Sequence, residues 1–157
     1  MPTETLQAAL EREHRAIDRG VETYIAGAGN DGAATAPLVE AIEALQRHIY
    51  LEEEFLFPPL RAAGMTMPIF VMLREHGELW TTMDTLTTLI DEKADSQRLR
   101  DVCSNFLSQL DQHNSKEEPI IYPQADTTLS AEATAELAEF IASGRTPQGW
   151  TCQKAQS

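Results

Sequence analysis

The histidines of this 157-residue chain are few, and they fall in a repeated pattern. A string of the form His-x3-Glu-Glu-x-apolar-apolar-aromatic-Pro starts at His48 and again at His113. An Arg-Glu-His string precedes each copy and ends at His14 and at His76, so the pattern uses all four histidines. This internal duplication predicts two related helical hairpins, each with one Arg-Glu-His helix and one His-x3-Glu helix.

The spacing within each copy suits metal binding. Residues four apart lie on the same face of an α-helix, so one histidine and one glutamate of each copy can face the same point. With one histidine from each Arg-Glu-His helix, the predicted ligands are His14, His48, Glu52, His76, His113 and Glu117. Two ions fit this set better than one, because each hairpin supplies two histidines and one glutamate, and a carboxylate can bridge two ions. Mixed imidazole and carboxylate ligands favour iron or manganese, and zinc less specifically.

Each of these features, taken singly, has a plainer explanation. A lone histidine on an apolar helix face is more often packed or exposed than a ligand, and an i,i+4 His–Glu pair can be an ordinary surface interaction. The duplication favours a buried metal cluster over both. The neighbouring charged residues could either orient the ligands or lie at the surface: Arg12, Glu13, Arg74 and Glu75.

Four apolar side chains are predicted to belong to the core and to line the pocket: Phe55, Trp80, Phe106 and Ile120. Phe55 and Ile120 each follow a histidine of the repeat by seven residues, which returns them to the ligand face of a regular helix. The pocket wall is therefore expected to be apolar.

Apolar residues recur at helical intervals along most of the chain. The predicted helices begin near residues 6, 35, 68, 96 and 130 and end near 25, 58, 90, 119 and 144, with Pro58 and Pro59 ending or bending the second. No segment alternates with a period of two for long enough to predict a strand. The pattern therefore predicts an all-α protein, an antiparallel four-helix bundle with a short fifth helix over residues 1–145, and a loosely ordered C-terminal tail over 146–157.

Composition excludes several classes of protein. A net charge of −13 and the lack of a basic patch argue against a nucleic-acid-binding protein, and 42% hydrophobic residues argue against disorder. No apolar run approaches the ~18 residues of a membrane span, and the first nine residues lack the layout of a signal peptide. Cys103 and Cys152 do not make a disulfide scaffold. We therefore expect a cytoplasmic protein that acts neither on nucleic acid nor in a membrane.

The histidine and glutamate strings between His14 and Pro123 resemble those of the hemerythrin-like, or HHE cation-binding, family. Within it the chain looks most like small stand-alone bacterial members, mycobacterial ones included, and it also resembles the four-histidine iron-sensing domain of an F-box protein. The resemblance implies a four-helix bundle holding two non-haem iron ions, oxo- or hydroxo-bridged, with Glu52 and Glu117 as bridging candidates. A ferritin-like reading is disfavoured, because the ferritin order Glu-x2-His occurs here once, at Glu11–His14.

One departure from the family pattern bears on function. Oxygen-carrying hemerythrins place two histidines four residues apart on the third helix, whereas His76 here has Met72 and Trp80 at those distances. Either one position stays open or water-filled, or another oxygen ligand fills it. The candidates for that additional ligand are Tyr50, Glu53 and Glu118, the two glutamates being otherwise expected to lie outside the ligand set. An exchangeable position favours chemistry with a small oxidant over reversible oxygen transport.

The leading functional hypothesis is catalase-like decomposition of hydrogen peroxide at the metals. The alternatives are a module that binds or senses O2 or NO, an iron-handling protein, and a helical interaction module without metal. The expected ligands are thus small peroxide or diatomic molecules.

Overall fold

The computed structural model describes residues 4–27 and 34–155. All the regular secondary structure in these residues is helical. Its elements are α1 (Leu6–Gly27), α2 (Ala36–Leu51), the π-helix η1 (Glu52–Leu56), α3 (Phe57–Ala62), α4 (Thr66–Asp91), α5 (Ser96–Ile120), α6 (Tyr122–Thr128) and α7 (Ala131–Ser143). The predicted all-α class is confirmed. Among the described helices, none combines the length and the apolar character needed to cross a bilayer.

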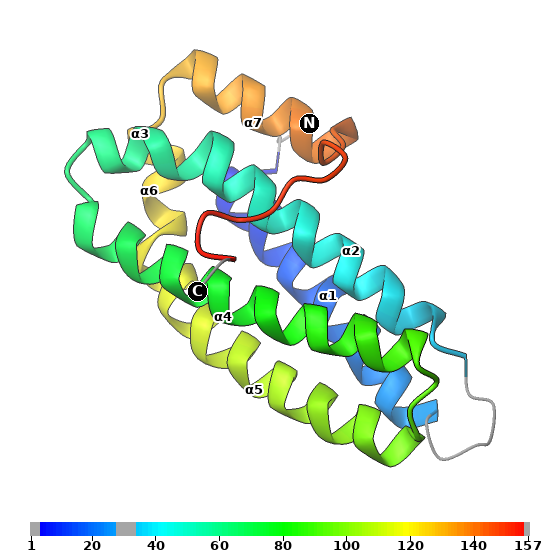
Figure 1. The fold of residues 1–157 in the computed structure, drawn as a ribbon. Helices are drawn as coiled ribbons and strands as arrows, with labels where there is room; N and C mark the ends of the chain where they lie inside the picture. The colour runs from blue at the N-terminus through cyan, green and yellow to red at the C-terminus, as the bar shows by residue number, and fades with distance from the viewer. Residues whose placement is uncertain (1–3, 28–33, 156–157) are drawn as a thin grey trace.

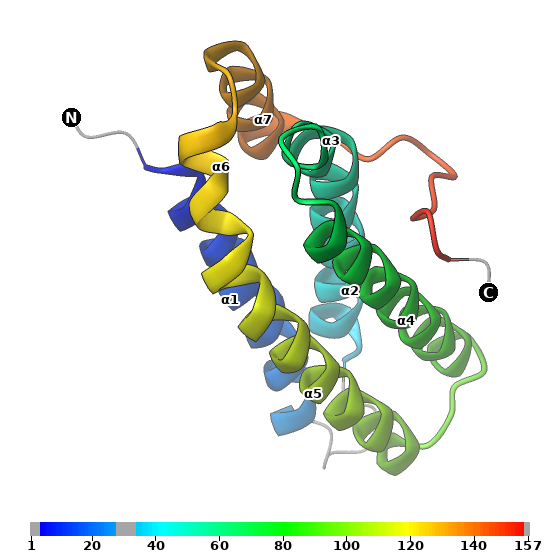
Figure 2. The same ribbon diagram turned by 90° about the vertical axis from the view of Figure 1, so that its left-hand side faces the viewer.

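Four long helices form the bundle (Figures 1 and 2). Helix α1 packs against α2 and α5, and α4 packs against α5 and α2, so the two predicted hairpins lie side by side. Helix α3 prolongs α2, α6 prolongs α5, and α7 lies across that end of the bundle (Figure 1). This arrangement is the predicted four-helix bundle with a short additional helix.

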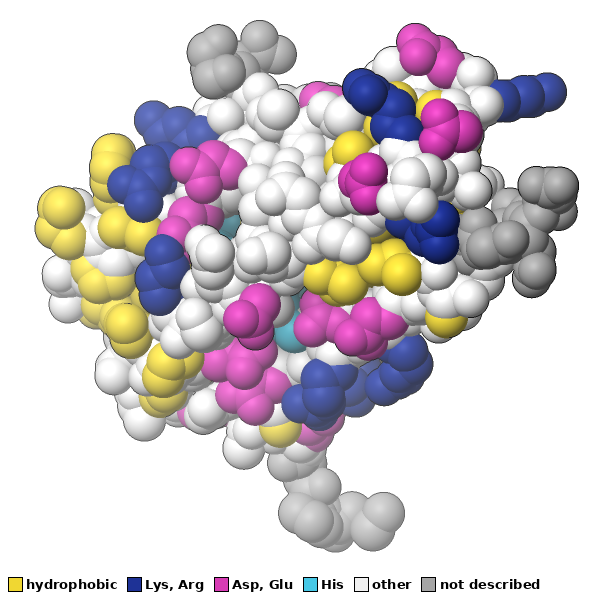
Figure 3. Space-filling model, turned by 90° about the horizontal axis from the view of Figure 1, so that it is seen from below, with side chains coloured by type: hydrophobic (Ala, Val, Ile, Leu, Met, Phe, Trp, Pro, Cys, Tyr) yellow, Lys and Arg dark blue, Asp and Glu magenta, His cyan; other side chains and the backbone are white. Residues whose placement is uncertain are grey.

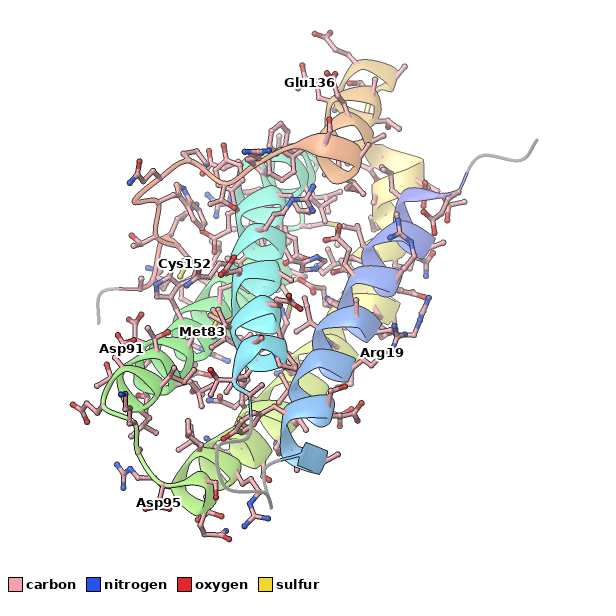
Figure 4. The ribbon with its side chains drawn as sticks, turned by 90° about the vertical axis from the view of Figure 1, so that its right-hand side faces the viewer. Arg19, Met83, Asp91, Asp95, Glu136 and Cys152 are labelled. Carbon is pink, nitrogen blue, oxygen red and sulfur yellow. The ribbon has the colours of Figure 1, made fainter. Side chains whose placement is uncertain are left out.

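Side-chain caps mark the starts of α5 and α7. The side chain of Asp95 accepts a hydrogen bond from the backbone N–H of Arg98 at the start of α5, where Figure 4 labels it. Ser130 accepts one from the backbone N–H of Ala133 at the start of α7, as predicted. Helix α4 begins at Thr66, two residues before the proline that was expected to open it.

The proline pair at 58–59 neither ends nor simply bends the second helix. It follows a five-residue π-helix, in which the backbone N–H of Phe57 reaches back to the carbonyl of Glu52. Proline has no N–H to donate, and a π-turn of this kind absorbs one extra residue without ending the helix. In the second copy, α5 contains Pro119 and breaks at Ile121 before α6 begins. Both copies of the repeat therefore depart from a regular α-helix at the same place.

The core is divided into two apolar clusters with a polar layer between them. One cluster includes Ile17, Leu45 and Leu110, and the other includes Leu10 and Leu73. The four histidines lie in α1, α2, α4 and α5 between residues of these two clusters, and all four are buried. The layer is thus shielded along the bundle axis on both sides.

The C-terminal tail is packed where the sequence predicted loose order, at least through residue 155. Cys152 is buried in the same core cluster as Met83, and Trp150 packs against that cluster (Figure 4). The backbone of Lys154 lies directly against Gly77 of α4. A glycine at this position allows the close approach, because a Cβ atom there would overlap the Lys154 carbonyl.

Gly77→Ala should therefore displace the tail and lower the free energy of unfolding by about 1–3 kcal/mol, the usual cost of an overpacked contact. Urea unfolding measures the loss, and labelling with a thiol reagent should show Cys152 becoming reactive. Gly27→Ala is the matched control, because nothing lies within 4 Å of a Cβ there. Equal stability of the two variants would show that the tail does not depend on this contact.

Candidate metal centre

The structure brings together the six residues predicted from the duplicated pattern. Their ligand atoms form two groups, and within each group the atoms lie within 4.8 Å of one another. The first group is His14, His48, Glu52 and Glu117, and the second is Glu52, His76, His113 and Glu117. The two glutamates belong to both groups, as expected of carboxylates that bridge two ions.

The distances show how closely the carboxylates approach the imidazoles. The Oε2 atom of Glu52 lies 3.1 Å from Nε2 of His48, and its Oε1 atom lies 3.0 Å from Nε2 of His76. The Oε1 atom of Glu117 lies 3.1 Å from Nε2 of His14 and 3.3 Å from Nε2 of His113. Each glutamate therefore contacts one histidine from each hairpin.

Two glutamates of the Arg-Glu-His strings accept hydrogen bonds from the Nδ1 atoms of histidines. Glu13 accepts a hydrogen bond from Nδ1 of His48, and Glu75 accepts one from Nδ1 of His113, both at 2.8 Å. Arg12 instead pairs with Glu4 at the surface. Of the two roles that the sequence left open, these glutamates have the first, because they fix the orientation of histidines in the two groups.

Glu53 and Glu118 do the same for the other two histidines. Glu53 accepts a hydrogen bond from Nδ1 of His76, and Glu118 accepts one from Nδ1 of His14, both at 2.7 Å. The other oxygen of Glu53 accepts the backbone N–H of Gln153, so the C-terminal tail contacts this layer too. These two glutamates thus lie outside the ligand groups. All four histidines have Nδ1 occupied by a carboxylate, which leaves Nε2 to point inward.

Tyr122 is the site residue that sequence reasoning missed. Its hydroxyl oxygen lies 2.8 Å from Nε2 of both His14 and His48, and it lies within hydrogen-bond distance of Oε2 of Glu52 (2.5 Å) and Oε1 of Glu117 (3.0 Å). Its phenol oxygen therefore sits among the four ligand atoms of the first group. The available signal was the aromatic position of the repeat, which Tyr122 occupies in the second copy.

Tyr50, the tyrosine considered in the sequence, lies elsewhere and is wrong as an additional ligand. Its ring packs against Phe55, Phe140 and Trp150.

The aromatic position of the repeat, Phe57 or Tyr122, follows the histidine of its copy by nine residues. In a regular helix, it would lie about two and a half turns away from that histidine, on the opposite face. The π-helix in one copy and the break at Ile121 in the other change that register.

The same change of register overturns two of the pocket-lining predictions. Ile120 is 50% exposed, and Phe55 packs against Tyr50 and Phe140 rather than facing the histidines. Trp80 and Phe106 are buried in the core cluster that contains Leu110. They belong to the core that borders the polar layer.

The pKa shifts of the site residues indicate that the site favours bound positive charge. Burial alone would raise the pKa of the Glu117 carboxyl, but the facing imidazoles, His113 first, hold it well below its ordinary value. Burial opposes protonation of His113, yet Glu117, Glu75 and Glu52 together outweigh it and raise the pKa of His113 to about 10. Burial, together with the charges of Glu117 and Glu52, raises the pKa of Tyr122 well above its ordinary value. A bound cation would take the place of protons held here.

Unpartnered atoms indicate that the residues fit a metal. Glu52 Oε1, His76 Nε2 and Glu117 Oε2 are buried and make no hydrogen bond within the described residues. The first two lie only 3.0 Å apart, yet their orientation is not that of a hydrogen bond. Buried polar atoms without partners are costly, and a metal ion would satisfy all three.

Comparison with protein families decides the assignment. The model of the hemerythrin HHE cation-binding domain matches residues 5–125, which includes every residue of the two groups. The chain belongs to the hemerythrin HHE cation-binding family. Its histidine and glutamate groups are thus those of a metal-binding helical domain.

The curated proteins that this hemerythrin HHE domain matches are distant from it in sequence. Uncharacterized proteins of Mycobacterium bovis (strain ATCC BAA-935 / AF2122/97) and Mycobacterium tuberculosis (strain ATCC 25618 / H37Rv) are each 25% identical over 146 residues. The matched region is 83% of this chain and 57% of each relative, so the chain spans a little over half the length of the curated relatives it matches. No solved structure matches the chain.

Glu53→Gln should weaken metal binding by roughly 10–100-fold, because an amide cannot supply the charge that holds His76 through Nδ1. Competition with a coloured chelator measures the change in affinity. Glu54→Gln is the control, because this substitution removes the same charge one residue away, at an exposed position. If both variants bind metal like the parent protein, the carboxylate contact to His76 has no part in holding the ligand.

Proposed function

We propose that this hemerythrin HHE domain holds two non-haem iron ions and reacts with small oxidants, with catalase-like decomposition of hydrogen peroxide as its activity. The observation that carries the proposal is the pair of buried ligand groups that share Glu52 and Glu117. Iron suits this ligand set, in which imidazole nitrogen and carboxylate oxygen are mixed and both cysteines lie outside.

The protein's own contribution is to position and to shield. Four carboxylates fix the histidines through Nδ1, so the Nε2 atoms are directed inward, where they would hold the metals. The two apolar clusters exclude bulk water from both sides of the layer. Two bound irons would supply the redox chemistry, in which one peroxide is reduced to water and a second is oxidised to O2.

A small cavity lies beside His113 of the second group. A cavity of about 40 Å³ borders the second group and is lined by Glu75, Glu78, Leu79, Gln109, Gln112 and His113. It is large enough for a few water-sized molecules and too small for an organic substrate. Figure 3 shows histidine surface in small patches among acidic side chains on one face of the molecule. Peroxide and diatomic gases fit this opening.

Tyr122 is proposed as the ligand that takes the place of the absent fifth histidine in the donor count. Its oxygen lies within hydrogen-bond distance of four ligand atoms, and an adjacent ferric ion would favour the deprotonated phenol that burial and the two carboxylates disfavour. A phenolate donor stabilises ferric iron over ferrous iron, which suits oxidant chemistry better than reversible oxygen transport.

The activity is tested by oxygen evolution from hydrogen peroxide with iron-loaded protein. His113→Ala should reduce the rate by more than the roughly 10–100-fold that loss of an orienting partner costs, because it deletes a ligand. Ser115→Ala, an exposed position on the same helix, should keep the parent rate. Oxygen evolution that survives His113→Ala would exclude the assigned site as its source.

A visible absorption spectrum tests Tyr122. Ferric protein should show a broad visible band from phenolate-to-iron charge transfer, and Tyr122→Phe should abolish it while two irons per chain remain bound. Tyr50→Phe is the matched control and should leave the band intact, because Tyr50 packs away from the site. A band that is lost in Tyr50→Phe and kept in Tyr122→Phe would reverse the assignment.

Binding of O2 or NO is the second candidate, favoured by the same small cavity beside His113. A reversible spectral change on adding and removing the gas, without peroxide turnover, would select it. Iron-dependent loss of helix content or of protease resistance would instead indicate iron handling.

A further inference from the structure

The C-terminal tail follows the matched family domain, which ends at residue 125, and yet it reaches the layer of ligand groups. Figure 1 shows it crossing the bundle over α2 and α4. The Trp150 ring packs edge-on against Tyr50 of α2, with ring centroids 5.0 Å apart, and against Trp80 of α4, at 5.6 Å. We call residues 150–155 the strap, because this segment joins the two hairpins on one side of the bundle.

The strap meets the site through a hydrogen bond and a close backbone contact. The backbone N–H of Gln153 donates to Oε1 of Glu53 at 3.0 Å, and Nδ1 of His76 donates to Oε2 of the same carboxylate at 2.7 Å. The next residue of the strap, Lys154, lies against Gly77, which follows His76 in α4. The strap therefore contacts both the carboxylate that orients His76 and the helix that carries it.

The equivalent carboxylate of the other repeat shows what the strap adds. Glu118 holds the place of Glu53 in the second copy and accepts a hydrogen bond from Nδ1 of His14, likewise at 2.7 Å. The side chain of Glu118 is 36% exposed, whereas that of Glu53 is fully buried. A hydrogen bond in a buried environment is electrostatically stronger than one that competes with water. The strap thus gives Glu53 a fixed donor and a dry setting, so Glu53 holds its imidazole more firmly than Glu118 does.

This dry setting depends on the seating of the strap. The Cys152 side chain is buried in the core cluster that contains Trp80 and Met83. Burial, together with the charge of the Glu53 carboxylate, raises the pKa of the Cys152 thiol to about 12, so the thiol brings no second negative charge beside that carboxylate. Lifting the strap would remove the Gln153 donor and let water compete for Glu53.

We propose that Gln153 is a positioning residue of the metal site, whose backbone N–H fixes Glu53 and through it His76, so that the strap retains the metal ion of the second ligand group. The inference rests on the proposed two-ion site, and it assigns control of metal exchange to a segment beyond the family domain. The first ligand group does not depend on the strap, because other carboxylates orient its two histidines.

The rate at which EDTA removes cobalt(II) from the loaded protein tests this assignment, followed through the visible cobalt band. Gln153→Pro deletes the N–H and suits the local backbone. Residue 153 is the second residue of a turn that the Ala155 N–H closes onto the Cys152 carbonyl at 3.1 Å, without a positive φ, and proline is favoured there. One cobalt per chain should leave at least about tenfold faster than from the parent protein, and the other at the parent rate.

Gln153→Ala is the matched control, because it keeps the N–H and should release cobalt at the parent rate. In a Glu53→Gln background, Gln153→Pro should have no further effect, since the strap acts through that carboxylate. A general loosening of the fold would instead speed release in both backgrounds. Trp150→Ala removes the packing on Tyr50 and Trp80, so it should also speed release of one cobalt, and it keeps the test decisive if Gln153→Pro does not fold.

Release of both ions at the parent rate from Gln153→Pro, or additive effects of Gln153→Pro and Glu53→Gln, would overturn the assignment. Metal analysis before chelation separates this outcome from failure of the proposed function. A parent protein that holds two ions but evolves no oxygen from peroxide would contradict the proposed activity and leave the role of the strap standing. A parent protein that holds no second ion would contradict both.

Discussion

Two glutamates buried side by side impose the constraint on which the rest of the structure depends. Glu52 and Glu117 are fully buried, and the charge of each disfavours ionisation of the other. Removing two carboxylates from water is tolerated only where positive charge and hydrogen-bond donors face them. The four inward-facing histidines and the Tyr122 hydroxyl meet that requirement, and a pair of cations would meet it more completely.

Keeping the imidazoles in place requires a further ring of carboxylates. Each Nδ1 atom contacts a glutamate from a different helix, so the histidines also tie the bundle together. Each hairpin supplies one such glutamate through its Arg-Glu-His string and one through the glutamate after its ligand. Glu53 in turn accepts the backbone N–H of Gln153, which links the packed tail to this ring. The acidic surplus of the sequence therefore includes residues with a defined structural role.

Where the helices are regular, the sequence predicts the fold correctly, and the predicted site residues lie close together. The i,i+4 rule and the duplication are sufficient to bring six residues to one layer, and the predicted starts of α5 and α7 near residues 96 and 130 agree with the structure. The failures lie where the helix is irregular. Ile120 turns to solvent, and Tyr122 turns to the site, because the repeat ends in a π-helix in one copy and a break in the other. The tail was missed because its packing depends on Gly77, a residue far away in sequence.

Under the proposed function, Glu52 and Glu117 would bridge two iron ions, which would then be magnetically coupled. Mössbauer spectroscopy of protein loaded with ⁵⁷Fe tests it directly, with a parallel iron determination on the same sample. Two ferric ions per chain that are coupled antiferromagnetically to a diamagnetic ground state, silent in electron paramagnetic resonance, are the predicted result. A single isolated high-spin ferric ion per chain, with its paramagnetic signal, would contradict it.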